Sequence, residues 1–204
     1  MRNKFLSSIA LLGITVLFLT SCAKVPQAEI DAAMAAIDQA KTAGAEIYAQ
    51  DGYVALQDSL KGVMATIESQ KSKLIKNYST AKEHLAGVTQ FAGMVVQQAE
   101  NRKEELKMEI QNTITEVKAL IESNRQLILD APKGKEGTSA LVAIKGEIDA
   151  VETSINETST LFETGEYLAT LDKAKAAKEK ASAINTELTD VITKYKSNVK
   201  GKKA

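Results

Sequence analysis

Residues 81–129 contain no proline, and their apolar side chains recur at the spacing of a helix. The spacing is clearest in the second half of the run. Aliphatic residues there follow one another at intervals of three and four, and isoleucines repeat every seven: Leu106, Ile110, Ile114, Val117, Leu120, Ile121, Leu127 and Ile128. So broad a stripe predicts a helix that packs on two neighbours, as in a bundle. At about 1.5 Å per residue the run would be a rod about 70 Å long.

The first half of this run is poorer in large side chains. Its small residues are Ala86, Gly87, Ala92, Gly93 and Ala99, with three valines and one phenylalanine between them. We therefore expect weaker packing over this half than over the second.

Residues 27–78 are expected to form a helical hairpin. Apolar side chains keep a three-and-four spacing over residues 30–48 and again over residues 53–78. Between them, Gln50-Asp51-Gly52 has the composition of a turn. Two helices joined so tightly should fold back on each other as an antiparallel pair.

The boundary between this hairpin and the long helix has two readings. In the first, the helix ends near Tyr78, and Thr80 with Glu83 three residues later forms a capping box that opens the long helix. In the second, one continuous helix passes through this point. The sequence leaves both open.

A second hairpin is expected over residues 139–200. The clearest break in the chain precedes it, at residues 130–137, where one proline and two glycines lie close together. Helical stripes then cover residues 141–162 and 167–195, with a turn at Glu163-Thr164-Gly165. No apolar pattern after residue 26 alternates over the length of a strand. The sequence thus predicts an all-α fold, an elongated antiparallel bundle of about five helices over residues 27–200.

The two hairpins match each other when the chain is shifted by 114 residues without gaps. The matches include two aromatic residues five apart, and an Asp and a Lys that follow them. In order, the paired positions are Tyr48 with Phe162, Tyr53 with Tyr167, Asp58 with Asp172 and Lys61 with Lys175. This pattern indicates a duplicated helical hairpin flanking one long helix. It also predicts that Tyr53 and Tyr167 occupy equivalent positions between helices.

The segment Gly165-Glu166-Tyr167, with Ala169 after it, resembles the start of the second helix in tetratricopeptide repeats. In that family the tyrosine packs between helices and the small residue permits their close approach. The resemblance covers one half-repeat. It implies a surface that holds peptides or partner helices.

The N-terminus has the three-part layout of a secretory signal. A short basic start with Arg2 and Lys4 precedes an apolar run over residues 5–19, and Leu19-Thr20-Ser21-Cys22 closes it. That last stretch resembles the lipobox of bacterial lipoproteins. The Ala-rich hairpin that follows is similar to an uncharacterised family of small helical lipoproteins from bacteria.

The lipobox resemblance implies that residues 1–21 are a signal peptide, cut between Ser21 and Cys22. Cys22 would then carry the diacylglycerol, and residues 22–26 would be a lipidated tether. An uncleaved anchor is the first alternative, but the apolar run of fifteen residues is shorter than the roughly 20 that a spanning helix needs. An ordinary secretory signal followed by a free thiol is the second.

A lipidated Cys22 implies a protein of the bacterial cell envelope. By the lipoprotein sorting rule of well-studied two-membrane bacteria, Ala23 rather than an aspartate after the cysteine would imply the outer membrane, with the protein facing the periplasm. At the other end, five lysines and no acidic residue follow Asp190, and residues 201–204 form a basic tail. This lysine-rich end is either a solvated helix terminus favoured by the helix dipole or a contact with an anionic envelope surface.

Composition argues against several classes of function. Without the signal peptide the chain carries 24 basic and 26 acidic side chains, whereas nucleic-acid-binding proteins usually leave a clearly basic footprint. We expect no nucleic acid partner. His84 is the sole histidine and Cys22 the sole cysteine, so one chain cannot assemble a zinc or haem site from them. We predict no cofactor and no enzymatic activity.

Three functions remain compatible with these features. The first is a structural or protein-interaction module that binds another envelope protein. The second is a chaperone-like holder of apolar client segments. The third is a carrier of a small apolar ligand between the first three helices, where Gly87 and Gly93 leave room.

Overall fold

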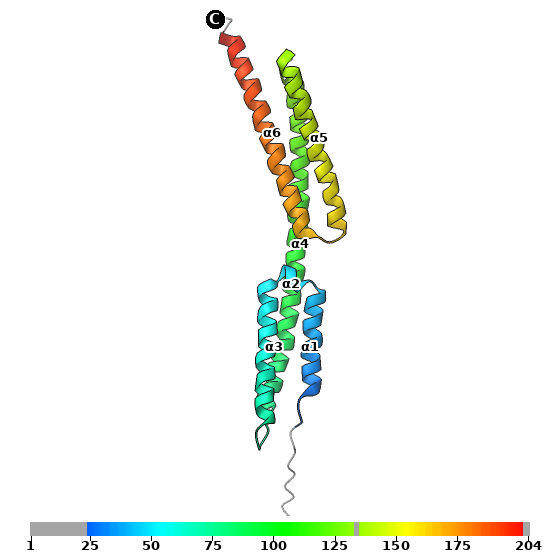
Figure 1. Ribbon diagram of the computed structural model, residues 1–204, viewed down its shortest axis with the longest axis vertical. Helices are drawn as coiled ribbons and strands as arrows, with labels where there is room; N and C mark the ends of the chain where they lie inside the picture. Colours follow the sequence, from blue (N-terminus) through cyan, green and yellow to red (C-terminus); the bar gives the residue numbers. More distant parts are fainter. Residues whose placement is uncertain (1–23, 133–134, 202–204) are drawn as a thin grey trace, which may run out of the picture.

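The computed structural model describes residues 24–132 and 135–201, and within these ranges it contains six α-helices and no strand (Figure 1). The helices are α1 (Gln27–Thr42), α2 (Ala45–Tyr48), α3 (Gln50–Lys71), α4 (Ser79–Asp130), α5 (Lys135–Glu163) and α6 (Tyr167–Gly201). The prediction of an all-α, elongated helical fold is confirmed. The sixth helix, beyond the five expected, is the single turn α2.

Helix α4 is the axis of the molecule. Its 52 residues span about 78 Å at the ordinary helical rise. Helices α1, α2 and α3 pack along its N-terminal part, and α5 and α6 pack along its C-terminal part (Figure 1). The result is two bundles placed end to end that share α4, the first formed with α1, α2 and α3 and the second with α5 and α6. We call them the first and the second bundle.

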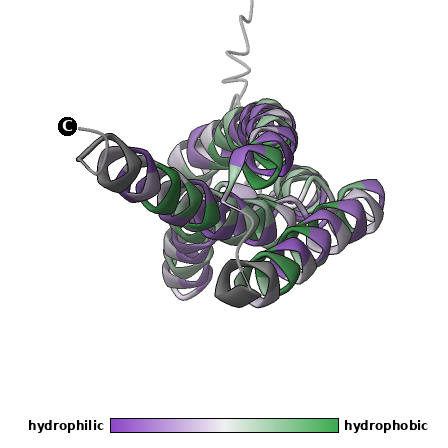
Figure 2. Ribbon diagram, turned by 90° about the horizontal axis from the view of Figure 1, so that it is seen from above, coloured by the Kyte–Doolittle hydropathy of each residue, from purple (hydrophilic) through white to green (hydrophobic). Residues whose placement is uncertain are grey.

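The first bundle buries apolar residues from each of its helices. Hydrophobic and hydrophilic residues both occur along the helices of the molecule (Figure 2). Large aliphatic residues from three helices meet in the core of the first bundle: Ile30, Ile37, Leu56, Ile67, Leu85 and Val95. Alanines fill the positions between them and let the helices approach closely: Ala33, Ala40, Ala92 and Ala99. The first half of α4 is therefore well packed, contrary to the expectation from its small residues. Met34, which the apolar stripe over residues 30–48 placed in the core, is half exposed, whereas Ala33 and Ala40 are fully buried.

The second bundle has a core of longer aliphatic side chains, taken from the second half of α4 and from α5 and α6: Val117, Ile121, Ile148, Val151, Ile155, Ile184 and Leu188. One amide lies fully buried among them. The Asn124 Nδ2 donates to the carbonyl oxygen of Ala181 at 2.8 Å, and Asn185 Nδ2 donates to Asn124 Oδ1 at 2.8 Å. This pair satisfies the buried amide and sets the register of α6 against α4. The prediction that this half of the long helix contacts two neighbours is correct.

The first hairpin turns earlier than predicted. Helix α1 ends at Thr42, and Gly44 adopts a left-handed φ of +79°, with its N–H donating to the carbonyl oxygen of Lys41. The predicted turn at residues 50–52 is wrong, because these residues open α3. The glycine at position 52 has a role in packing rather than in a turn. A Cβ there would lie 3.0 Å from Gln98 Oε1 and 3.2 Å from Val95 Cγ2, so the glycine permits close approach of α3 to α4.

The first hairpin and the long helix are separate helices joined by residues 72–78. Helix α3 ends at Lys71, and Leu74, predicted to continue its stripe, is exposed in the connection. The capping box of Thr80 and Glu83 is not formed. Instead Asn77 Oδ1 accepts hydrogen bonds from the N–H of Ser79 at 2.9 Å and from its hydroxyl at 2.8 Å. An Asn side chain that folds onto the backbone two residues later is a common way to start a helix.

The second hairpin follows the prediction more closely. Its turn lies at residues 163–165, where Gly165 has a φ of +81° and Glu166 donates its N–H to the carbonyl oxygen of Leu161. Helix α5 begins at Lys135, four residues before the predicted start. Residues 133–134, in the middle of the predicted break, lie outside the described residues.

The two hairpins meet α4 in opposite directions. Both turn at the middle of the molecule, so α1 runs parallel to α4 while α5 runs antiparallel to it (Figure 1). Tyr53 and Tyr167 each lie near the start of the second helix of their hairpin, as the sequence match predicts. Their surroundings differ, however: Tyr53 is buried in the first bundle, and Tyr167 is half buried where the two bundles meet.

Candidate functional site

The two hairpin turns meet in a cluster of three aromatic side chains, Tyr48, Phe162 and Tyr167, which we call the aromatic junction. The ring centroids of Tyr48 and Tyr167 lie 6.2 Å apart, and those of Phe162 and Tyr167 lie 5.5 Å apart, edge to face. The Tyr48 hydroxyl donates to the carbonyl oxygen of Gly165 at 3.0 Å, across 117 positions of sequence. The aromatic junction therefore joins the first bundle to the second directly, besides their common helix.

Two lysines of α4 lie over these rings. Lys103 Nζ is 5.6 Å from the centroid of Tyr48, and Lys107 Nζ is 5.3 Å from that of Tyr167. Both distances fall within the range of cation–π attraction. The hydrogen bond from Lys107 to Glu104, 2.7 Å long, raises the pKa of the lysine, and the nearby Tyr167 acts in the same direction. The cation over Tyr167 thus stays charged at neutral pH.

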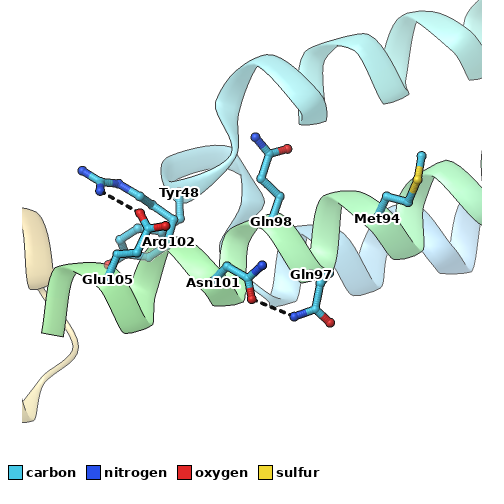
Figure 3. A pocket seen from close by; sticks show the side chains of 7 residues that line it. All are labelled: Tyr48, Met94, Gln97, Gln98, Asn101, Arg102 and Glu105. Atoms are coloured by element: carbon cyan, nitrogen blue, oxygen red, sulfur yellow. Dashed lines mark hydrogen bonds and ion pairs between the residues drawn. The ribbon is translucent and has the colours of Figure 1, made fainter. Parts of the chain in front are cut away.

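An open groove of about 460 Å³ lies beside the aromatic junction, between α2 and the middle of α4 (Figure 3). We call it the junction groove. Gln97 Nε2 donates to Asn101 Oδ1 at 2.8 Å, and Arg102 pairs with Glu105 at 3.2 Å. The residues that line the junction groove are Tyr48, Met94, Gln97, Gln98, Asn101, Arg102 and Glu105.

The side chains of the junction groove are mainly hydrogen-bonding and charged groups. Its amides offer both donors and acceptors at about the spacing of one helical turn, and its guanidinium and carboxylate pair loosely at the surface. Met94 adds an exposed, adaptable apolar surface. Such a set suits contact with a polypeptide backbone and its side chains.

A second groove of about 530 Å³ runs between α3 and α4 in the first bundle. Gly62 and Gly87 line it, and a Cβ at either position would meet nothing within 4 Å. Val63, Val88 and Phe91 supply apolar walls, and His84, an exposed residue, lies at its edge. Gly87 thus leaves room as predicted, whereas Gly93 does not line this groove.

The predicted lipid site lies outside the described residues. Cys22, the cleavage point after Ser21 and the signal peptide of residues 1–21 precede Lys24, the first described residue. The lipidation of Cys22 therefore stays a prediction. The basic tail after Gly201 also lies outside the described residues.

Residues 24–132 and 135–201 contain no helix that is both long and apolar enough to cross a membrane. Among the same residues, no three His, Cys, Asp or Glu side chains are grouped to hold a metal ion.

Comparison of the chain with protein-family models, with curated proteins and with solved structures found no match in any of the three.

Sequence reasoning did not identify the aromatic junction as a site, although a signal for it was present. The match at offset 114 pairs Tyr48 with Phe162 and places Tyr167 directly after a glycine turn. These are three of the seven aromatic residues in the chain after residue 22. What the sequence could not supply was that the two turns face each other at the same level of α4.

Proposed function

We propose that this protein is a lipid-anchored structural and protein-interaction module of the bacterial cell envelope, without enzymatic activity. Cys22 would bear the lipid, and the outer membrane, with the protein facing the periplasm, is the most consistent location. The lipobox resemblance supports the anchoring, and the shape of the helical domain supports the interaction role.

The observation that carries the proposal is the sharing of α4 by both bundles. A single helix of about 78 Å, with one bundle packed along each of its two parts, makes a stiff rod. Rods of this kind hold two ends apart and present long side surfaces. The grooves described along it are open to solvent, which suits macromolecular contact better than enclosure of a small substrate.

The proposed partner is another envelope protein that lays a polypeptide segment into the junction groove. The amides of Gln97, Gln98 and Asn101 can pair with its backbone, and Met94 can pack on an apolar side chain. Arg102 is exposed, and its one ion pair among the described residues is with the nearby Glu105. It can exchange that partner for an acidic group.

Two glutamines of α4 provide matched positions for a crosslinking test of docking in the junction groove. Gln97 lies in the junction groove and Gln126 lies on the second bundle. Both are exposed, and each makes one side-chain hydrogen bond to a residue four positions away. A photo-crosslinking residue at position 97 should capture one defined envelope protein in cells, and the same residue at 126 should not. Equal capture at both positions, or at neither, would contradict the groove as the docking site.

The anchor is tested separately. Two or three acyl chains, at about 0.8 kcal/mol per buried CH₂, hold a protein firmly on a bilayer. Cys22→Ala should therefore move the protein from the membrane fraction to the soluble fraction and abolish incorporation of labelled fatty acid. A Cys22→Ala protein that stays membrane-bound would show that the anchor is something else.

The α3–α4 groove favours a second candidate, the carriage of a small apolar ligand. Gly87→Leu would fill the groove from an open helix face, so folding should be retained. If the protein is a carrier, native mass spectrometry should detect an apolar ligand on the natural protein and not on Gly87→Leu. An identical, ligand-free mass profile for both would exclude this role.

A further inference from the structure

The end of the first bundle that points away from the aromatic junction carries two aliphatic side chains in full contact with water. Leu74 is 101% exposed and Ile75 is 84% exposed, adjacent to each other in the connection between α3 and α4. Single exposed apolar residues are common on protein surfaces. Leu74 and Ile75 are instead two neighbours at the tip of a turn, and neither packs on the domain. Together they form a small exposed apolar surface, which we call the apolar point.

The connection is held in place on both sides. Lys73 donates its N–H to the carbonyl oxygen of Gln70 at 3.2 Å, and Asn77 caps the N–H of Ser79 at 2.9 Å. Tyr78 is buried in the core of the first bundle directly after the exposed pair. The two aliphatic side chains are therefore presented by a fixed turn.

Lysines surround this apolar point. The segment from Lys71 to Lys76 reads Lys-Ser-Lys-Leu-Ile-Lys. Lys71 pairs with Glu68 on its own helix, whereas within the described residues Lys73 and Lys76 form no ion pair. Aliphatic side chains flanked by free ammonium groups are complementary to the boundary between the acyl chains and the anionic headgroups of a bilayer.

The N-terminal end of the described chain lies at this same end of the molecule. Glu29 in the first turn of α1 pairs with Lys82 in the first turn of α4 at 2.8 Å, and Val25 packs against the core of the first bundle. The start of α1 and the 72–78 connection lie together at the lower end in Figure 1. Residues 1–23 thus join the domain beside the exposed aliphatic pair.

We propose that Leu74 and Ile75 insert into the headgroup boundary of a bilayer that contains anionic lipids, with Lys73 and Lys76 on its phosphates. The inference rests on the proposed anchoring at Cys22, which would place this end of the rod at the membrane. The turn adds a second attachment point beside the lipid. Two points fix the direction of the rod, so the second bundle extends away from the membrane along α4.

The absence of tryptophan from the sequence makes a direct test available. Leu74→Trp places a single tryptophan at the turn. Val142→Trp places one on α5 in the second bundle, at a side chain that is likewise exposed and apolar. The acylated, full protein is reconstituted on vesicles of phosphatidylglycerol and phosphatidylcholine whose acyl chains are brominated. We expect blue-shifted and strongly quenched emission from position 74, and neither effect at position 142.

The lysines are tested in the Leu74→Trp background. Replacing Lys73 and Lys76 by glutamine should lower the equilibrium constant for insertion of the turn into the bilayer about fivefold for each lysine removed. Vesicles of phosphatidylcholine alone should reduce the quenching in the same way. Quenching at position 74 that is unchanged by both would contradict the electrostatic part of the proposal.

Failure of the anchor and failure of the turn are distinguishable. If the protein sediments with vesicles and the tryptophan at 74 is quenched no more than the one at 142, the turn does not insert and the inference is wrong. If Cys22 proves unacylated, the anchoring proposal is wrong instead. The sole thiol can then be coupled to a maleimide lipid, and the same comparison of positions 74 and 142 decides the inference.

Discussion

At the scale of single residues, Tyr48 has the most consequential position in this chain. Its ring packs against the core of the first bundle and against a separate small cluster of Leu106, Ile110 and Leu171, and its hydroxyl donates a hydrogen bond to the turn of the second hairpin. It is also one wall of the junction groove. One half-buried side chain thus contributes to the stability of the middle of the molecule and to the surface proposed for binding.

Tyr48→Phe removes only the hydrogen bond to Gly165 and should cost about 1 kcal/mol in the free energy of unfolding. Tyr48→Ala also removes the ring contacts. Its cost should approach the lower end of the about 3–5 kcal/mol typical of core aromatics. Urea denaturation followed by circular dichroism measures both. Tyr195→Phe, at a half-exposed ring near the end of α6, is the control and should be neutral. A neutral Tyr48→Ala would show that the bundles do not depend on this contact.

Tyr53 and Tyr167 should respond differently to truncation, although the sequence match treats them alike. Tyr53 is 6% exposed inside the first bundle, so Tyr53→Ala should cost about 3–5 kcal/mol. Tyr167 is half buried at the aromatic junction, so Tyr167→Ala should cost less. Melting temperatures of the two variants check the order, and the reverse order would contradict the burial described.

At the scale of elements, two glycines decide where the hairpins turn. Gly44 and Gly165 both have a positive φ, which residues with a side chain adopt only at a cost. The helical stripe alone predicted the second turn and misplaced the first. In the first hairpin the chain needs an extra short helix, α2, before α3 can begin.

Alanine at these glycines should therefore have unequal effects. Gly165→Ala adds only backbone strain, about 1–2 kcal/mol, because the space around it is open. Gly44→Ala should cost more, since its Cβ would also lie 3.1 Å from Tyr48 Cδ2. Gly62→Ala, inside α3 and facing open space, should instead stabilise by about 0.5–1 kcal/mol. Chemical denaturation of the three variants tests the order, and a stabilising Gly44→Ala would be incompatible with the turn described.

Ion pairs between elements make stability depend on pH. A hydrogen bond from Lys175 on α6 holds the pKa of Glu109 below its ordinary value of 4.5, and Lys82 does the same for Glu29. A depressed pKa in the folded protein means that the stabilisation is present above pH 4.5 and is lost as the pH falls through the lowered pKa. Both pairs are exposed to solvent, so the effect should be small and weakened by salt.

Glu109→Gln should accordingly flatten the fall in stability between pH 5 and pH 3 while lowering stability slightly at pH 7. Glu68→Gln is the matched control, because Glu68 pairs only within its own helix. Urea midpoints measured over this pH range give the comparison. A profile for Glu109→Gln as steep as that of the natural protein would assign the acid sensitivity to other groups.

At the scale of the whole molecule, the shared α4 predicts an elongated particle in solution. A compact domain of 183 residues, the length from Cys22 to Ala204, would have a radius of gyration of about 16 Å. A rod about 78 Å long has a radius of gyration of about 22 Å. Small-angle X-ray scattering should give the larger value. A value near that of a compact domain would mean that the two bundles fold against each other.

The sequence by itself determined the class of the fold and most of its helical segments. Residues such as Ile110, Val117, Ile148 and Leu188 lie in the core because a period of 3.6 places them on one face of a helix, whatever that face contacts. The turn at Gly165 was also predictable, since glycine and polar neighbours interrupt the stripe there.

Only the tertiary structure decided how these helices share one axis. The local periodicity of the sequence does not predict the direction in which a hairpin packs on α4. Nor does it predict that the two turns meet at Tyr48 and Tyr167, or that Leu74 is exposed. Gly52 shows the reason most clearly. Read locally it is a turn residue, but in the fold its missing side chain makes room for Val95 and Gln98 of another helix. Contacts between segments far apart in the chain gave these residues their roles, and no local pattern carries that information.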